Sequence, residues 1–185
     1  TKDKVKKREI GIVKKQDISV NQVKIVYLAV GSNLGNKLLN VNKVKDKLMD
    51  YKINIIKSSS SYETLSWPNI KYPKFINIVI KAETFYSAKE LIKICLNIEK
   101  ALGRKRTKKN SPRVCDIDII DYHQKKVKLN SYKLEIPHPR MHLRNFVLLP
   151  LYEINKSWIH PIKKKNIKNL INSLNIQDLT AIKQI

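Results

Sequence analysis

The sequence is poor in cysteine and contains no long hydrophobic run. Only Cys95 and Cys115 occur among 185 residues, and both lie in apolar stretches, which argues against a disulfide framework and favours a reducing compartment. No apolar run approaches the ~18–20 residues that cross a bilayer, and the first twenty residues are rich in lysine without an apolar signal core. We therefore expect a cytoplasmic protein with no membrane span and no signal peptide.

Acidic residues are also scarce. The chain has 15 acidic and 38 basic residues, a formal net charge of +23, which raises the possibility of a nucleic-acid partner. The lysines, however, are spread from Lys2 to Lys183, which indicates compositional bias more than a polyanion-binding surface. The arginines are different, because five of the six lie between Arg104 and Arg144. Arginine grips phosphate oxygens with two parallel hydrogen bonds, so this clustering suggests a phosphate site, although it also suits ion pairs.

Two carboxylates interrupt an apolar segment, RVCDIDII, that otherwise reads as a strand. Asp116 and Asp118 are two residues apart, so in an extended chain they share one face, while Cys115, Ile117 and Ile119 share the other. At an effective dielectric of about 20, two such charges ~6 Å apart repel by roughly 3 kcal/mol. A solvated edge strand or pairing with lysine would tolerate them. A Mg²⁺ site shared with substrate phosphates would use them.

The surrounding pattern predicts an α+β domain. Strands are expected at residues 24–30, 53–64, 74–84 and 113–120, and helices follow a cap at Asn36, ending near Tyr51, and a cap at Ser87, ending at Gly103. This β-α-β-β-α-β order predicts a ferredoxin-like sandwich, with a mostly antiparallel sheet, both helices on one face and the active site on the other.

The chain length suits one domain with flanks. We expect a domain at residues 24–160, a basic N-terminal tail or linker at residues 1–23, and a Lys/Asn-rich C-terminal extension at residues 161–185. A nucleic-acid-binding module of the RRM type shares the predicted topology and is the alternative at this point. Such a module needs stacking aromatics in its strands, whereas the last strand here carries two acids.

Several motifs in chain order resemble the 6-hydroxymethyl-7,8-dihydropterin pyrophosphokinase family of folate biosynthesis. They are YLAVGSNLGN, FINIVIKAET, IEKALGRKR, SPRVCDIDII and IPHPRMHLRNFVLLPLYEI. The resemblance covers roughly residues 24–160. It implies an enzyme that transfers pyrophosphate from ATP to the pterin hydroxymethyl group and releases AMP, with ATP and 6-hydroxymethyl-7,8-dihydropterin as partners.

The resemblance also implies roles for particular residues. Asp116 and Asp118 match the family's pair that binds two Mg²⁺ ions on ATP. Positions that match contacts to the nucleotide or to the leaving charge are Glu99, Arg104, Arg106, Arg113, His138 and Arg144. The arginines Arg104, Arg106 and Arg113 and the two aspartates are the expected catalytic set. His138 could instead be a structural turn residue, and Glu99 an ordinary exposed helix acid.

The pterin is expected to stack between Phe75 and Phe146, with Asn77 bonding the ring edge. The main chain of Thr64, Leu65 and Trp67 is expected to add hydrogen bonds. Phe75 and Asn77 share a strand face, which suits a joint role, although phenylalanine is also a common core residue. Gly31 and Gly35 need only a turn interpretation, because GSNLG lacks the Lys-Ser/Thr of a phosphate-binding loop.

Two departures from the family pattern concern the segments near the phosphates. Between Arg106 and Arg113 the sequence TKKNSP is shorter and lacks a tryptophan, with Ser111 in the place of a glycine, and Pro139 stands where some members have tyrosine. We expect this short stretch to act as a lid that depends on charge. The first 23 residues have no counterpart, and a fusion to another folate-pathway domain, or a degenerate scaffold copy within such a fusion, stays open.

Overall fold

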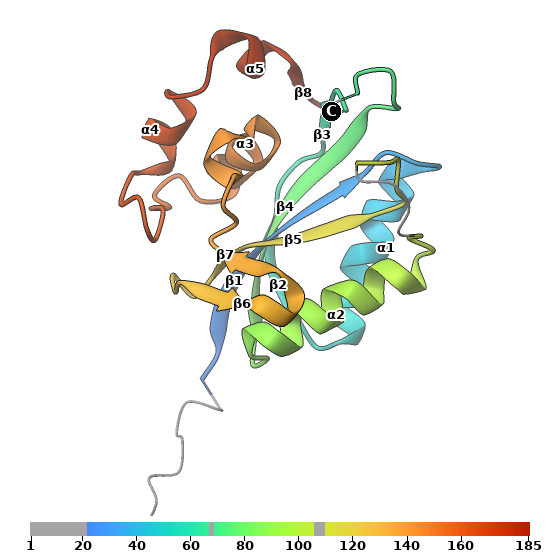
Figure 1. The fold of residues 1–185 in the computed structure, drawn as a ribbon, viewed down its shortest axis with the longest axis vertical. Helices are drawn as coiled ribbons and strands as arrows, with labels where there is room; N and C mark the ends of the chain where they lie inside the picture. Colours follow the sequence, from blue (N-terminus) through green and yellow to red (C-terminus); the bar gives the residue numbers. More distant parts are fainter. Residues whose placement is uncertain (1–21, 67–68, 106–109) are drawn as a thin grey trace, which may run out of the picture.

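The computed structural model describes residues 22–66, 69–105 and 110–185 as a mixed assembly of helices and antiparallel sheet (Figure 1). The predicted combination of helices with a mostly antiparallel sheet is confirmed. In chain order the elements are β1 (Lys24–Ser32), α1 (Lys37–Asp50), β2 (Asn54–Ser58), β3 (Tyr62–Thr64), β4 (Phe75–Thr84), α2 (Ala88–Ala101), β5 (Asp116–Tyr122), β6 (Val127–Leu129), η2 (Asn130–Tyr132), β7 (Leu134–Ile136), η3 (Met141–Leu143), α3 (Asn145–Ile154), α4 (Ile167–Ile171), α5 (Ile176–Thr180) and β8 (Ile182–Gln184).

The main sheet is built around β1. Its strands follow the order β5-β1-β4-β3-β8, and β2 pairs with β4 beside β3. All these pairings are antiparallel, and β1 joins β4 along its whole length while β5 lies on its other side. The short strands β6 and β7 form a separate hairpin. Because β1 is central, residues on β4 and β5 face one another across it.

One face of the sheet forms the larger hydrophobic core with α1 and α2. Val26, Leu28 and Val30 of β1 point into this core together with alternate residues of β4 and β5. Both helices begin at side-chain caps, Asn36 for α1 and the capping box of Ser87 with Glu90 for α2. The predicted helices and their caps are therefore confirmed, and their apolar faces meet the sheet.

The opposite face is partly covered by α3 and α4, which the sequence analysis did not anticipate. Tyr27 of β1, Val79 of β4 and Ile120 of β5 form a second core with these helices. Figure 1 shows α3 on the side of the sheet away from α1 and α2. The candidate site lies on this same face, beyond the end of the second core.

Two predicted strands differ from the observed ones. The single strand expected at residues 53–64 is divided into β2 and β3, because the main chain and the hydroxyl of Ser59 bond to Val79 and turn the chain at this point. The last predicted strand begins at Asp116 and not at Arg113. The amide and carbonyl of Arg113 bond to Asn33, so they are not available to a strand ladder.

Residues 161–185 contain folded elements, although the sequence analysis assigned none there. Ile167 and Leu170 of α4 are buried in the second core, and β8 pairs with β3 at the edge of the sheet. The boundaries proposed for the domain and its flanks stay a prediction. No helix in the described ranges is both long and apolar enough to cross a membrane.

The burial of α4 predicts that residues 161–185 contribute to stability. We expect Leu170→Ala to lower the free energy of unfolding by about 2–5 kcal/mol, as for other buried leucines. Ile176→Ala is the control, because Ile176 is 77% exposed and its truncation should change stability by no more than about 0.5 kcal/mol. Urea unfolding of both variants provides the measurement. Equal, small effects would show that α4 adds nothing to the core.

Candidate active site

The site is centred on Asp116 and Asp118 of β5. Their partners across the sheet are Gly31 and Ala29 of β1, while Ile117 between them enters the core with α1 and α2. The two carboxylates therefore lie on the same face, as the spacing predicts. Their side chains are 24% and 36% exposed, respectively. They are close enough to solvent for a ligand to reach them.

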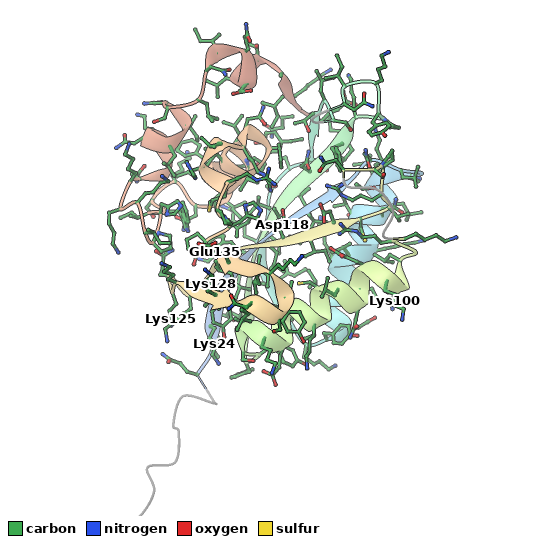
Figure 2. The ribbon with its side chains drawn as sticks, in the orientation of Figure 1. Lys24, Lys100, Asp118, Lys125, Lys128 and Glu135 are labelled. Atoms are coloured by element: carbon green, nitrogen blue, oxygen red, sulfur yellow. The ribbon has the colours of Figure 1, made fainter. Side chains whose placement is uncertain are left out.

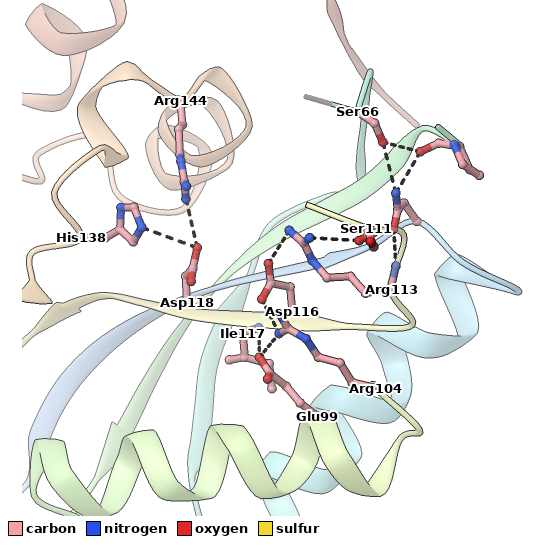
Figure 3. Close-up of polar contacts among 12 residues, drawn as sticks. Ser66, Glu99, Arg104, Ser111, Arg113, Asp116, Ile117, Asp118, His138 and Arg144 are labelled. Atoms are coloured by element: carbon pink, nitrogen blue, oxygen red, sulfur yellow. Dashed lines mark hydrogen bonds and ion pairs between the residues drawn. The ribbon is translucent and has the colours of Figure 1, made fainter. Parts of the chain in front are cut away.

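Three arginines and a histidine surround the two acids (Figure 3). Asp116 pairs with Arg104 through Oδ1 at 2.5 Å and with Arg113 through Oδ2 at 2.7 Å. Asp118 Oδ2 lies 3.0 Å from Arg144 Nη1 and 4.0 Å from Nε2 of His138. Among the described residues, the positive charge that the acid pair requires thus comes from arginine and not from lysine.

Glu99 connects α2 to the acid-bearing strand. Glu99 is only 4% exposed, and its carboxylate accepts a hydrogen bond from the amide of Ile117 at 2.9 Å and pairs with Arg104 at 2.5 Å. Burial by itself lowers the pKa of the Arg104 guanidinium, but the carboxylates of Asp116 and Glu99 outweigh this and raise it. Arg104 is consequently held as a cation. The alternative of an ordinary exposed helix acid is wrong for Glu99.

His138 faces Asp118 with one particular nitrogen. Its Nδ1 accepts a hydrogen bond from the amide of Arg140, and its own amide donates to the carbonyl of Ile120. In the neutral ring the proton therefore lies on Nε2, which points to Asp118. Burial lowers the pKa of His138, and the Asp118 carboxylate opposes this effect. A neutral donor is thus placed beside Asp118.

Each of the two predicted pterin aromatics is covered by one of these arginines. The Arg113 guanidinium carbon lies 5.1 Å from the centre of the Phe75 ring, and that of Arg144 lies 5.5 Å from the centre of Phe146. Two Phe–Arg–Asp series result, one through Arg113 to Asp116 and one through Arg144 to Asp118. Both aromatics are thereby linked to the acid pair.

The floor beside Phe75 is polar and closely packed. Asn77 is buried and donates through Nδ2 to the hydroxyl of Thr64 at 2.9 Å. A Cβ atom on Gly31 would lie 3.0 Å from Oδ1 of Asn77 and 3.5 Å from the Phe75 ring. Gly31 is therefore a strand residue that keeps this floor open. The turn interpretation is therefore wrong for Gly31 but holds for Gly35, which lies between β1 and α1 with a φ of +66°. The alternation of β1 residues could have placed Gly31 on this face.

The remaining predicted residues are only partly described. Leu65 follows β3 and its side chain is 48% exposed. Trp67 and Arg106 lie outside the described residues, as do residues 107–109 of the predicted lid. Apart from Leu65, each predicted site residue that the structure describes contacts at least one other predicted site residue.

A cavity of ≈ 1040 Å³ opens beside the acid pair. Its lining comes from α2, β5, the β6–β7 hairpin and the segment after it: Ile92, Leu96, Asn97, Glu99, Lys100, Arg104, Asp116, Ile117, Asp118, Ser131, Tyr132, Lys133, Leu134, Glu135, His138, Pro139 and Arg140. Figure 2 labels three charged members, Asp118 on β5, Glu135 on β7 and Lys100 at the end of α2. The cavity lining thus carries both acidic and basic side chains.

No cluster of three or more histidine, cysteine or acidic residues suited to hold a metal ion occurs within the described ranges. A divalent ion at Asp116 and Asp118 would consequently need ligands from a substrate or from water. Mg²⁺ commonly binds in this way, through one or two carboxylates and the phosphates of a nucleotide.

Comparison with known proteins gives a consistent result. Residues 27–156 match the family described as 7,8-dihydro-6-hydroxymethylpterin-pyrophosphokinase (HPPK). The chain is similar to the 2-amino-4-hydroxy-6-hydroxymethyldihydropteridine pyrophosphokinase of Aquifex aeolicus, with 37% identity over 143 residues, which cover 77% of this chain and 88% of that protein. It is also 40% identical over 159 residues to the Folic acid synthesis protein FOL1 of Dictyostelium discoideum, covering 84% of this chain and 24% of that protein.

A solved structure extends the comparison to the fold. The Plasmodium falciparum HPPK-DHPS crystallised with pteroate has a TM-score of 0.70 and 17% identity, and the match covers 92% of this chain and 48% of that chain. The chain therefore spans most of the Aquifex protein but less than half of the Dictyostelium and Plasmodium proteins.

The position of Glu99 leads to a prediction about stability. Glu99→Gln keeps an oxygen for the Ile117 amide but removes the charge that faces Arg104, so we expect the free energy of unfolding to fall by about 1–3 kcal/mol. Asp46→Asn makes the same acid-to-amide change on the exposed side of α1 and should be neutral within about 0.5 kcal/mol. Urea unfolding measures both. A neutral Glu99→Gln would mean that the ion pair with Arg104 contributes no stability.

Proposed function

Because the chain belongs to the 7,8-dihydro-6-hydroxymethylpterin-pyrophosphokinase family, we propose that it transfers the pyrophosphoryl group of ATP to the hydroxymethyl oxygen of 6-hydroxymethyl-7,8-dihydropterin and releases AMP. It is thus an ATP-dependent transferase of tetrahydrofolate synthesis. The observation that carries this proposal is the pair of Phe–Arg–Asp series. They put cationic groups between two aromatic rings and two carboxylates, as transfer between a flat heterocycle and a metal-bound polyphosphate requires.

The order of the strands and the packing of the helices also support the proposed function. We propose that the sheet is ferredoxin-like, with β2 and β3 together in the role of one edge strand. The α1 and α2 helices then form one layer, and the site occupies the other face. Fold alone does not define an activity, so the proposal depends on the site residues.

The nucleotide is proposed to occupy the cavity beside the acid pair. Its volume of ≈ 1040 Å³ is at the upper end of the ~300–1,000 Å³ common for ligand pockets, which suffices for a nucleotide. Phosphates at the Asp116 end would meet Arg104, Arg113 and Arg144, and His138 would add a neutral donor. In this arrangement Glu99 acts on the nucleotide through Arg104, since its carboxylate already holds that side chain.

Mg²⁺ fits the donor set that is present. Asp116 and Asp118 would hold two ions together with ATP oxygens, and the lack of a third acidic ligand among the described residues agrees with a metal shared with substrate. The bound metal would neutralise phosphate charge and orient the β-phosphorus. With the carboxylates engaged by an ion, the arginines that pair with them would become available to phosphate oxygens. Arg113 Nε, which is buried and lacks a hydrogen-bond partner in the described structure, would gain one in such a rearrangement.

The chain itself provides positioning and charge stabilisation. In the proposed reaction the hydroxymethyl oxygen bonds to the β-phosphorus, and the bond from that phosphorus to the α–β bridging oxygen breaks. AMP keeps the bridging oxygen, and the hydroxyl proton is released to water. Charge that builds up on the phosphoryl oxygens would be stabilised by Arg104, Arg113 and Arg144, which are already held near the acids.

The pterin is proposed to stack on Phe75 and Phe146, with its edge bonded by Asn77. Because the Thr64 hydroxyl accepts from Nδ2 of Asn77, the amide orientation is fixed before a ligand binds. The main chain at Thr64, Leu65 and Trp67 would complete the recognition of the ring. Because Arg113 covers Phe75, it would have to move aside, toward phosphate, for a ring to stack there.

Some relatives are much longer than the region that matches this chain, which bears on whether the whole protein contains a second enzyme. The match to the Plasmodium HPPK-DHPS covers 48% of that chain, and a bifunctional folate synthesis protein of Arabidopsis thaliana is 37% identical over 130 residues. We therefore propose that this chain is fused to, or associates with, another enzyme of the pathway, with residues 1–23 as a linker. The family match favours an enzyme over a nucleic-acid module.

A product assay tests the proposed function directly. Protein, Mg²⁺, ATP and 6-hydroxymethyl-7,8-dihydropterin are incubated together, and AMP and the pterin diphosphate are measured. Formation of both in equal amounts supports the proposal. AMP without pterin would indicate a nucleotidase, ADP another transfer, and no turnover a degenerate scaffold or, if RNA binds tightly, a nucleic-acid module.

The acid pair should be essential for turnover. Asp116→Asn or Asp118→Asn leaves the metal and phosphate charges without full neutralisation, so we expect kcat to fall by at least about 100-fold, or ~2.7 kcal/mol in the barrier. Asp46→Asn is the control for an acid-to-amide change outside the site. Steady-state rates are compared after circular dichroism has confirmed folding. Unchanged kcat in either folded variant contradicts the metal assignment.

The aromatic pair should affect pterin binding more than nucleotide binding. Phe75→Ala or Phe146→Ala should weaken pterin binding by about 1–3 kcal/mol and leave MgATP affinity nearly unchanged, whereas a plain core phenylalanine would mainly cost about 3–5 kcal/mol of stability. Phe85, which is 60% exposed, gives the matched control Phe85→Ala. Calorimetric titrations and thermal melts distinguish the two cases.

A further inference from the structure

Asn33 joins three parts of the chain that are far apart in sequence. It is 1% exposed and immediately follows β1. Its Nδ2 donates to the hydroxyl of Ser66 and to the carbonyl of Pro73, each at 3.2 Å. Its Oδ1 accepts from the amide of Arg113 at 2.7 Å, and its own amide donates to the carbonyl of Arg113 at 3.1 Å. We call these four bonds the Asn33 clamp, most of which is visible in Figure 3.

The first part held by the clamp belongs to the proposed pterin side of the site. Ser66 lies next to Leu65, and Pro73 precedes Phe75 by two residues. The Ser66 hydroxyl also donates to the Pro73 carbonyl at 2.6 Å, which closes this stretch on itself. The ends of the connection between β3 and β4 are therefore fixed to one another and to Asn33.

The second part belongs to the proposed nucleotide side. Arg113 is held by Asn33 through both its amide and its carbonyl, so the clamp sets the position of its main chain. The side chain of the same residue pairs with Asp116 at 2.7 Å and covers the Phe75 ring. Any ligand that draws Arg113 toward phosphate acts on a residue whose backbone is tied to Asn33.

The clamp leaves little freedom for independent motion. An asparagine amide has two N–H donors, and both are used, so one side chain serves Ser66, Pro73 and Arg113 at once. Asn33 is buried, its bond to Ser66 is buried, and its bonds to Pro73 and Arg113 are partly buried, so breaking them would leave the amide with little access to water. A shift of Arg113 is thus transmitted to Pro73 and Ser66 through a continuous set of hydrogen bonds.

We infer that Asn33 is a positioning residue that couples nucleotide binding to pterin binding. It does so by linking the main chain of Arg113 to the segment that leads into Phe75. This inference rests on the proposed function, because it requires that both ligands bind at this site. A nucleotide that moves Arg113 would change pterin affinity, and by linkage the pterin would change nucleotide affinity by the same factor.

The chain contains a matched control for this inference. Asn40 is also buried, and its Nδ2 likewise donates to one hydroxyl, that of Ser32, and to one carbonyl, that of Leu34. These bonds stay within residues 32–40 and do not reach either ligand segment. Asn33→Ala and Asn40→Ala therefore remove similar donor bonds, but only the first disconnects Arg113 from residues 66–73.

The test is the dissociation constant of the pterin with and without a saturating, Mg²⁺-bound, non-hydrolysable ATP analogue. In the unaltered protein we expect the two values to differ by at least about tenfold, within the 5–150-fold range common for coupled sites. Asn33→Ala should lower their ratio by severalfold, leaving only the part that arises because Arg113 covers Phe75 directly, and Asn40→Ala should leave it unchanged. A ratio that does not fall in Asn33→Ala, or one that falls equally in Asn40→Ala, overturns the inference.

A second variant decides the question if Asn33→Ala does not fold. Ser66→Ala removes one arm of the Asn33 clamp and leaves the bonds to Arg113, so the ratio should fall by severalfold. An unchanged ratio in Ser66→Ala overturns the inference while the AMP assay still supports the function. If the unaltered protein binds neither ligand and forms no AMP, the proposed function fails, and the inference fails with it.

Discussion

The site depends on the balance between two aspartate charges and the arginines around them. Asp116 and Asp118 share one strand face, where their repulsion would cost roughly 3 kcal/mol at an effective dielectric of about 20. Arg104, Arg113 and Arg144 offset it from three separate places: after α2, before β5 and at the start of α3. Each ion pair therefore does more than neutralise an acid. Together they hold the end of α2, the start of α3 and the segment that leads into β5 against the acid pair, and Glu99 in turn holds Arg104.

The same balance suits the proposed reaction. The acids and the arginines pair with one another, which offsets the cost of holding these charges partly buried. If the carboxylates held a metal as proposed, the arginines could exchange one set of oxygens for another, since phosphate and carboxylate offer similar acceptors to a guanidinium. Arg113 and Arg144 also cover Phe75 and Phe146, which places the exchangeable cations between the two proposed substrates. The charge is thus present before it is needed, which reduces reorganisation during transfer.

Features of the fold and the site that depend on neighbouring residues could be predicted from the sequence. Features that depend on contacts between distant residues could not. The caps at Asn36 and Ser87 and the common face of Asp116 and Asp118 follow from neighbouring residues alone. The late start of β5 does not, because it depends on bonds between Arg113 and Asn33, eighty residues apart. The burial of Leu170 likewise depends on a long-range contact, because α4 packs against α3 in the second core. Arg106 and Trp67 could be predicted only from the family pattern, and their roles stay predictions.

The central strand shows how one segment serves both a core and a site. On the face toward α1 and α2, β1 presents Val26, Leu28 and Val30, all of which fill the core. On the other face it presents Tyr27, Ala29 and Gly31, whose size decreases along the strand. Tyr27 lies beneath α3, where volume is needed for packing. Gly31 lies between Asp116 on one side and Asn77 on the other, and a Cβ there would crowd the Asn77 amide. The decrease in side-chain size along this face of β1 therefore marks where the part covered by α3 ends and the open site begins.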